Sequence, residues 1–529
     1  MSRATATWPG ARLGSLLPLE AVTPTIVVLA IGVLTIAALV LGNGNVWLAV
    51  APIAGAIALW AIAKSPIRNT LFVLFFLGLA LDKPGDADGR WESLFSSVGG
   101  LVVFNVAETF PGVPIKISGL WIILILLFVI RTHRSLTGRI VDVPGAVPMA
   151  PPMRWALIVS GVTVVWLIIL GAIGGGDIQM AKIQVQVILA LLVLAYLLAP
   201  ALKVTADYRT LAKIVVTAAC CKAVLALWVR HLFPDTITTR SGLVRELDFA
   251  TSHGDSLLFT SAFMMLLVAL AFERTKRHFA ALVGLGALIF AGMVANDRRL
   301  SWAQLGLGIM LFFAMNPGNW ITRRVMRATV LALPLIAVYV LAGWNVQSRV
   351  FRPVQTFRGM IEPQRLDGSI DRSTLFRDVE NYNLISTFQQ NAVFGRGFGQ
   401  MFDVPVKNDD MSGFKEYRYL PHNSLLGLMG FAGGLGVLGL LAPVVVALFL
   451  ASRALRLSST PEISMAAMVV LANLAAYLMH LWGDIGFTEP ASIFTVGTSF
   501  AVASQVAVST GAWRVAPVGL VRTFGTEGR

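Results

Sequence analysis

Long apolar stretches separated by short polar segments run along almost the whole chain. A stretch of about 20 apolar residues is long enough to cross about 30 Å of hydrocarbon as a helix. The pattern therefore predicts about fourteen transmembrane helices. They are expected near residues 24–42, 46–63, 69–81, 114–130, 155–174, 183–201, 210–230, 255–272, 279–295, 300–315, 328–343, 423–451, 463–483 and 491–509.

One long polar stretch, residues 344–421, interrupts this pattern between the eleventh and twelfth predicted spans. The chain accordingly divides into a transmembrane bundle over 1–343, a large loop domain over 344–421, C-terminal transmembrane helices over 422–509 and a tail over 510–529. The composition agrees with this division, since 56% of the residues are hydrophobic, only 13% are charged and the mean hydropathy is +0.75. A soluble domain carries about 25% charged residues. We expect an all-α polytopic membrane protein.

The formal net charge of +14 would suit nucleic acid or anionic lipid as a partner. The positive-inside bias of membrane proteins gives a simpler explanation. With the N-terminus in the cytoplasm, most basic clusters fall in cytoplasmic loops, and an even number of spans returns the C-terminal tail to the same side. We expect no nucleic-acid partner and place the large loop on the opposite, periplasmic face.

Three segments on that opposite face carry arginines that the topology does not require. They are residues 230–253, which include Arg245, the short turn at 296–299 with Arg298 and Arg299, and the large loop. Planar guanidinium groups donate paired, charge-assisted hydrogen bonds to phosphate. These arginines indicate an anionic ligand at that face, although an ion pair or a membrane anchor would also explain Arg298 and Arg299.

Within the large loop, apolar residues recur every three or four positions from Leu375 to Phe388. This spacing marks one face of a helix. The opposite face carries Arg377, Asp378, Glu380, Asn381 and Gln389. We expect an amphipathic helix that lies on the membrane surface or caps the bundle.

His422 stands where the large loop enters an apolar helix. The positive end of the helix dipole disfavours a charged imidazole, and a neutral imidazole can serve as a general base. A structural histidine is the plainer alternative, and Asn423 and Ser424 also fit as helix-capping residues.

Two further polar positions lie inside or beside predicted spans. Lys222 is about 20 Å along its helix, a depth at which an ionisable group is costly and is either functional or paired. His480 and Asp484 are four residues apart near the outer end of the thirteenth predicted span, where Asp484 could orient a base. The bodies of the predicted spans contain no Asp or Glu. This argues against a proton- or sodium-driven transporter.

The order of these features resembles the O-antigen ligase and Wzy polymerase superfamily. The resemblance covers residues 297–440 and rests on three elements: the turn Arg298-Arg299-Leu300-Ser301-Trp302 that opens a span, the Asn-x-x-Phe-Gly-x-Gly-Phe-Gly element, and His422-Asn423-Ser424. The second element comprises Asn391, Phe394, Gly395, Gly397, Phe398 and Gly399. Arg372 is similar to the arginine that precedes this element in the family. The double arginine departs from the family's commoner Ser-Arg form.

The resemblance implies an inverting glycosyltransferase that needs no cofactor and no metal ion. Its donor would be a glycan on undecaprenyl diphosphate, at the periplasmic face of the bacterial inner membrane. His422 would activate the acceptor hydroxyl, while Arg298 or Arg299, Arg372 and, less closely matched, Arg396 would bind the diphosphate. Asn423, Asp484, Arg245 and Lys222 are candidate supporting residues.

A polymerase and a ligase differ in the molecule that accepts the glycan. A polymerase joins two lipid-linked glycans, whereas a ligase transfers a finished glycan to lipid A-core or another acceptor. We favour a polymerase, because nothing in the residues indicates a specific ligation acceptor. A chain-length regulator or export machinery would be the protein partners, and membrane lipid surrounds the enzyme. A transporter or flippase of lipid-linked saccharides is the alternative from another class.

Overall fold

The structure, a computed structural model, describes most of the helical part of the chain. The described residues are 31–37, 40, 46–81, 118–136, 148–203, 205–232, 236–238, 244–246, 250–252, 254–273, 275–296, 298–316, 318–346, 351, 354, 358, 368–407, 416–486 and 489–514. Among them, eight helices are long and apolar enough to cross a membrane, or nine if a bent pair over Trp320–Arg327 and Val330–Gly343 is one span. The protein is a multi-pass helical membrane protein.

A helix lies in each predicted span from the second onward, although several are too short or too polar to count as membrane-crossing by length and composition. The total of fourteen therefore stays a prediction. The first predicted span is described only in part, with residues 31–37 helical. The helices are α2 (Val46–Lys64), α3 (Ile67–Ala80), α6 (Gly119–Leu136), α7 (Pro151–Ile173), α8 (Ile178–Leu198), η3 (Ala199–Ala201), α9 (Ala206–Leu232), α10 (Asp255–Phe272), α11 (Lys276–Asn296), α12 (Arg299–Met315), α13 (Trp320–Gly343), α15 (Gly368–Gln390), α16 (Ser424–Leu457), α17 (Pro461–Gly483) and α18 (Pro490–Ser509).

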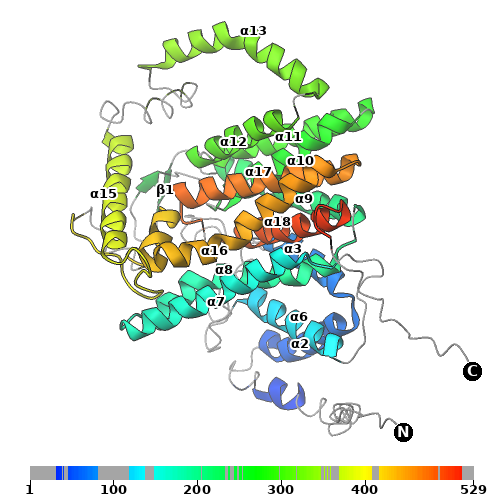
Figure 1. Ribbon diagram of the computed structural model, residues 1–529, viewed down its shortest axis with the longest axis vertical. Coiled ribbons are helices and arrows are strands. Elements are labelled where there is room, and N and C mark those ends of the chain that lie inside the picture. Colours follow the sequence, from blue (N-terminus) through cyan, green and yellow to red (C-terminus); the bar gives the residue numbers. More distant parts are fainter. Residues whose placement is uncertain are drawn as a thin grey trace, which may run out of the picture.

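Most of these helices run alongside one another, and α15 lies across one end of the packed bundle (Figure 1). A short antiparallel hairpin of β1 (Thr236–Thr238) and β2 (Val244–Glu246) follows α9. We call the end that α15 covers the loop end. It holds the C-terminal ends of α9, α11 and α17 and the N-terminal ends of α10, α12 and α16.

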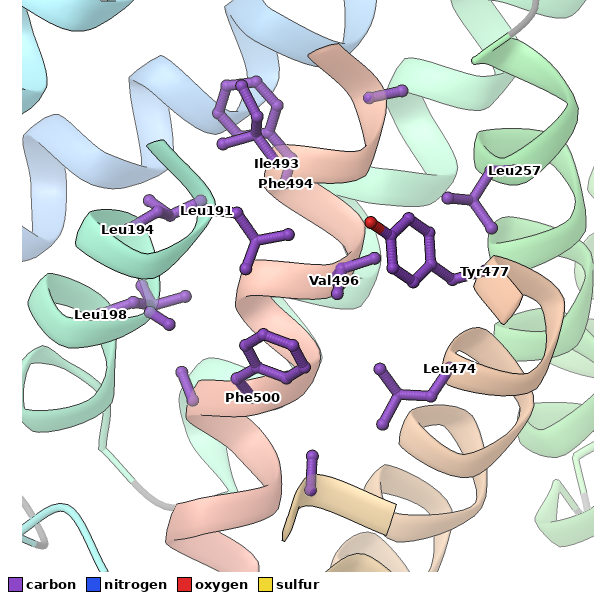
Figure 2. Close-up of a cluster of buried hydrophobic side chains, with 14 of the residues drawn as sticks. Leu191, Leu194, Leu198, Leu257, Leu474, Tyr477, Ile493, Phe494, Val496 and Phe500 are labelled. Carbon is purple, nitrogen blue, oxygen red and sulfur yellow. The ribbon is translucent and has the colours of Figure 1, made fainter. Parts of the chain in front are cut away.

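Helix α18 forms the centre of the core, and 89% of its most apolar 18-residue window is buried. Leucines of α8 face it from one side, and Leu474 and Tyr477 of α17 face it from the other (Figure 2). Its Phe494 ring meets the ring of Phe75 of α3 edge-on, with centroids 5.1 Å apart. Its buried Thr495 and Ser499 hydroxyls donate to carbonyls one turn earlier, at 2.9 and 2.8 Å. These local hydrogen bonds allow polar residues on a helix that is buried almost all round.

The glycine-rich turn after α15 fits into a break in helix α16. Gly433 has φ 62° and ψ −177°, which interrupts the helix and leaves backbone groups on both sides without helical partners. Residues 392–397 supply those partners. Gly397 N–H donates to Phe431 O at 2.8 Å, and Gly434 N–H donates to Ala392 O at 2.8 Å. Non-helical backbone inside a membrane protein is tolerated where protein satisfies it.

The same turn packs against the end of α7. A Cβ added to Gly397 would lie 2.1 Å from Gly171 N, and a Cβ added to Gly171 would lie 1.8 Å from Phe398 O. Gly397 also has φ +87°, a conformation that side chains other than glycine rarely adopt. Residues Gly395 to Gly399 thus fix the large loop to the bundle, and we call this segment the interlock.

Helix α15 confirms the predicted helix in the large loop. Unlike a simple amphipathic helix, it buries polar residues and exposes part of its apolar stripe. Glu380, Asn383 and Thr387 are buried, whereas Tyr382 and Ile385 of the predicted apolar stripe are exposed. Asn383 makes two hydrogen bonds to the backbone of Val406, at 2.9 and 3.1 Å. The polar face therefore holds the helix against the protein.

Candidate active site

His422 lies at the loop end, in the two-residue link between Pro421 and the start of α16. The next residue, Asn423, caps α16 by accepting a hydrogen bond from Leu426 N–H at 3.0 Å. The imidazole remains 25% exposed, so a solute can reach it. One face is covered by Phe376 of α15, whose ring meets the imidazole edge-on with centroids 5.6 Å apart.

Glu380 of α15 makes two contacts with His422. Its Oε2 accepts a hydrogen bond from the His422 backbone N–H at 3.2 Å, and its Oε1 lies 3.2 Å from the His422 Nδ1. The Glu380 side chain is 1% exposed. Beside it, Asn423 Nδ2 donates to Asn381 Oδ1 at 3.1 Å. Helix α15 therefore holds both His422 and its neighbour.

The C-terminal end of α17 meets these residues from the bundle side. Ser424 Oγ donates to Asp484 O at 2.8 Å, and Arg377 of α15 donates to Gly483 O at 3.1 Å. Asp484 is buried, and its own carboxylate accepts from Ile485 N–H at 2.9 Å. The carboxylate that contacts the His422 ring is thus Glu380, whereas Asp484 shapes the turn after α17.

The arginine-bearing turn is next to this same end of α17. A Cβ added to Gly483 would lie 2.7 Å from Leu300 Cδ1, so the start of α12 packs directly on Gly483. Arg298 caps α12 and is half-buried, while Arg299 is exposed. One turn further, Gln304 Nε2 lies 3.1 Å from the buried His480 Nδ1. Of the two arginines, Arg298 is the one that faces the protein.

These contacts bring two arginine-bearing segments to Gly483, beside the segment that carries His422. Arg377 reaches Gly483 from α15, and the turn that begins with Arg298 reaches it from α12. Helices α10, α12 and α16 also begin at this end, so the positive ends of their dipoles add to the local potential. The loop end thus gathers basic residues from two segments and the N-terminal ends of three helices.

Lys222 has a partner in the bundle interior. Its Nζ lies 3.3 Å from Asp255 Oδ1, and the two side chains are 0% and 1% exposed. Asp255 opens α10, so an acidic residue at the edge of a predicted span is in fact buried. A buried carboxylate at the edge of a span is thus present after all, although Lys222 neutralises it. Lys222 therefore has a structural role in the observed contacts.

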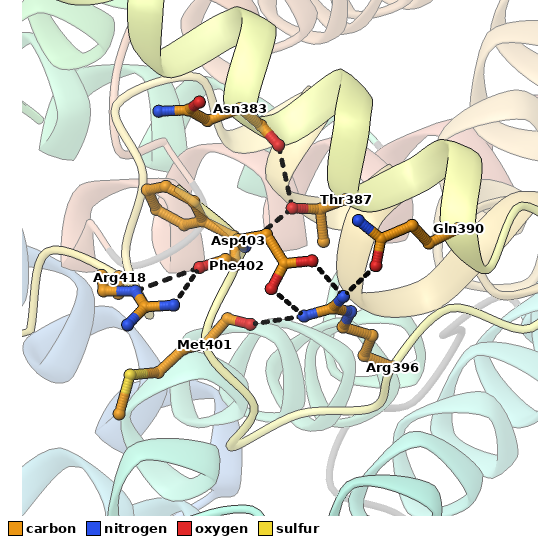
Figure 3. A network of polar contacts seen from close by, with 8 residues as sticks. All are labelled: Asn383, Thr387, Gln390, Arg396, Met401, Phe402, Asp403 and Arg418. Atoms are coloured by element: carbon orange, nitrogen blue, oxygen red, sulfur yellow. Dashed lines mark hydrogen bonds and ion pairs between the residues drawn. The ribbon is translucent and has the colours of Figure 1, made fainter. Parts of the chain in front are cut away.

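Arg396 is engaged within the large loop. Its guanidinium donates to both carboxylate oxygens of Asp403, one of them at 2.6 Å, and also to Gln390 (Figure 3). The hydrogen bond from Arg396 holds the pKa of the Asp403 carboxyl below its usual value. The Asp403 backbone N–H in turn donates to Thr387 of α15 at 2.9 Å. Arg396 thus has a structural role beside the interlock.

The remaining predicted residues are described only through their backbone. Arg372 lies in the first turns of α15, and Arg245 lies in β2 opposite Ile237. Among the described residues, no group of three or more His, Cys, Asp or Glu side chains could hold a metal ion.

Two residues of this site carry no recognisable signal in the sequence. Arg377 and Glu380 stand out only as part of the polar face of a helix, and 42 residues separate Glu380 from His422. Folding back of the large loop is what brings them to the imidazole.

No protein family matches this sequence, and no curated protein matches it.

Proposed function

We propose that this protein is a membrane glycosyltransferase that joins glycans carried on undecaprenyl diphosphate. The observation that carries the proposal is the meeting of an accessible histidine with arginines from two separate segments at one end of a helical bundle. The turn that begins at Arg298 packs through Leu300 on Gly483 at the end of α17, and Arg377 donates to the Gly483 carbonyl, next to the segment that carries His422. A base beside an anion-binding site is the arrangement that transfer from a sugar diphosphate requires.

In the proposed reaction, the acceptor hydroxyl gives its proton to the His422 imidazole while its oxygen attacks the anomeric carbon of the donor sugar. The bond from that carbon to the diphosphate oxygen breaks, and the diphosphate leaves with the electron pair. Attack from the opposite side inverts the anomeric configuration. Arg298 and Arg377 stabilise the charge that develops on the leaving group, a task that fixed cationic donors perform without a metal ion.

The membrane supports the choice of substrate. A polyprenyl chain partitions into lipid, so its diphosphate head lies at the membrane surface, and we propose that the loop end lies at that surface. We propose that this face is periplasmic, that the protein resides in the bacterial inner membrane, and that both termini are cytoplasmic. The resemblance to O-antigen polymerases and ligases in residues 297–440 points to the same substrate class.

The test uses purified protein in lipid nanodiscs with an oligosaccharide on undecaprenyl diphosphate. Native protein should yield a ladder of longer lipid-linked glycans. His422→Gln should lose at least about 10²-fold in rate, because a general base contributes about 10² to 10⁴-fold. His278→Gln is the matched control, since His278 also lies near a glutamate, Glu273, but at the far end of the bundle, with a side chain 70% exposed.

Each result has a defined meaning. A ladder that His422→Gln retains at full rate would contradict the proposal. Product formed only when a second acceptor is supplied would make the protein a ligase rather than a polymerase. Movement of the lipid-linked glycan across the membrane with no new glycosidic bond would make it a flippase and refute the enzymatic assignment.

A further inference from the structure

Glu380 is a buried carboxylate whose contacts are with His422. The side chain is 1% exposed, and burying a carboxylate is costly unless hydrogen-bond donors compensate it. Among the described residues, the donors that reach Glu380 belong to one residue, since Oε2 accepts from the His422 backbone and Oε1 faces the His422 ring. These two contacts hold both the main chain and the imidazole ring of His422 in place.

The contact with Glu380 also determines which nitrogen of the His422 ring carries hydrogen. An ionised carboxylate can only accept hydrogen bonds, so the 3.2 Å contact with Oε1 requires hydrogen on Nδ1. In a neutral imidazole the other nitrogen, Nε2, then carries the lone pair. Phe376, standing edge-on to the ring with an interplanar angle of 90°, restricts rotation about the side chain.

We infer that Glu380 is a positioning residue for His422, which keeps the imidazole in the Nδ1–H tautomer with Nε2 aimed away from α15 and ready to accept a proton. Glu380 touches no substrate and takes no proton in the reaction. The inference rests on the proposed function, because an Nε2 without hydrogen matters only if it accepts the proton of an acceptor hydroxyl.

A purely structural role for Glu380 is the competing explanation, since it also joins α15 to the start of α16. Asn381 with Asn423 makes the same connection, and Asn383 with the backbone of Val406 holds α15 against the loop. Removal of the Glu380 charge alone should therefore leave the helix in place. Glu380→Gln tests this, because the amide keeps the shape of the side chain but replaces one acceptor oxygen with a donor.

The experiment compares native protein, Glu380→Gln and the control Glu273→Gln in lipid bilayers. Glu273 also faces a histidine, since its Oε2 lies 3.6 Å from His278 Nδ1. Solid-state NMR on ¹⁵N-histidine protein reports the tautomer directly, and His422→Gln identifies the His422 signal among the six histidines. We expect an Nδ1–H signature for His422 in native protein, its loss in Glu380→Gln and its retention in Glu273→Gln.

Glycan transfer is measured on the same samples. Glu380→Gln should lower the rate by about tenfold or more, but by less than loss of the base itself, which contributes about 10² to 10⁴-fold. In a His422→Gln background the same change should have less than about a twofold effect, because the two residues act through one proton transfer. Glu380→Asp keeps an acceptor-only side chain and should restore the Nδ1–H signature. If Glu380→Gln does not fold, an Nε2–H signature for His422 in native protein would still overturn the inference.

The two proposals fail in different ways. An unchanged His422 tautomer in Glu380→Gln would overturn the positioning role, whatever happens to transfer. A changed tautomer with full transfer would uphold that role and refute His422 as the base. A full additional loss in the His422→Gln background would show that Glu380 acts independently of the histidine and would overturn the inference.

Discussion

The interlock between the large loop and the bundle leads to a prediction about Gly397. Replacement by alanine places a methyl group 2.1 Å from Gly171 N and 2.5 Å from Gly171 Cα, both of which are backbone atoms. The residue also keeps φ near +87°. A non-glycine residue in a sparsely populated backbone region costs about 1–3 kcal/mol. A forced shift in a packed interior costs about 1–3 kcal/mol more. Gly397→Ala should lower the unfolding free energy by about 2–6 kcal/mol.

The matched control is Gly161→Ala in α7, the helix against which Gly397 packs. A Cβ at Gly161 meets nothing within 4 Å, and alanine is favoured over glycine inside a helix by about 1 kcal/mol. Unfolding in mixed micelles, followed by tryptophan fluorescence, compares the two variants with native protein. If Gly397→Ala unfolds with the same free energy as Gly161→Ala, the loop is not fixed to α7 as described. Glycan transfer should fall in Gly397→Ala as well, since α15 precedes the interlock directly.

Two ion pairs give further predictions. Lys222→Met should lower the unfolding free energy by about 3–5 kcal/mol, because it leaves a buried charge on Asp255 without compensation. Lys222→Met/Asp255→Leu should recover most of that loss, and a double variant as unstable as the single would contradict the pairing. The Arg396 hydrogen bond lowers the pKa of Asp403, so this pair adds stability above about pH 4 that is lost as the pH falls. Asp403→Asn should be less stable than native protein at pH 6, by at most about 1 kcal/mol for so exposed a pair. The difference should shrink toward pH 3, and a constant difference at all pH values would argue against the linkage.

The helical elements follow from the sequence because hydrophobic stretches of membrane length have few alternatives. Helix α17, predicted over 463–483, spans Pro461–Gly483, and α10 matches its predicted range of 255–272. The helix in the large loop is likewise predicted, since residues from Leu375 to Phe388 keep a helical period. Local spacing suffices for each of these elements.

The faces of α15 do not follow from the sequence in the same way. Periodicity separates apolar from polar positions, but in a membrane protein an apolar side chain can meet lipid as readily as protein. In the structure Tyr382 is exposed, and Glu380 is buried because the start of α16 supplies two donors for its carboxylate. Only the return of the chain from Gly395 to Pro421 brings those donors into reach.

The same limit applies to the arginines of the candidate site. Arg298 and Arg396 are equally visible in the sequence, as charged residues beside short turns. Asp403 neutralises Arg396 from seven residues away, whereas the turn of Arg298 packs on Gly483 far along the chain. The sequence does not distinguish an arginine that pairs within its own loop, such as Arg396, from one at the start of a helix, such as Arg298. The tertiary contacts do.

The most direct test of the proposed site measures donor binding and glycan transfer on the same preparations of native protein, His422→Gln and Arg298→Gln. A fluorescent undecaprenyl-diphosphate oligosaccharide reports binding in nanodiscs, and product size reports transfer. We predict that His422→Gln binds the donor within about twofold of native protein but loses at least about 10²-fold in transfer. Arg298→Gln should weaken donor binding about tenfold or more, since a hydrogen bond to a charged group contributes about 1.5–3 kcal/mol. Equal donor binding by native protein and Arg298→Gln, together with full transfer by His422→Gln, would contradict the account.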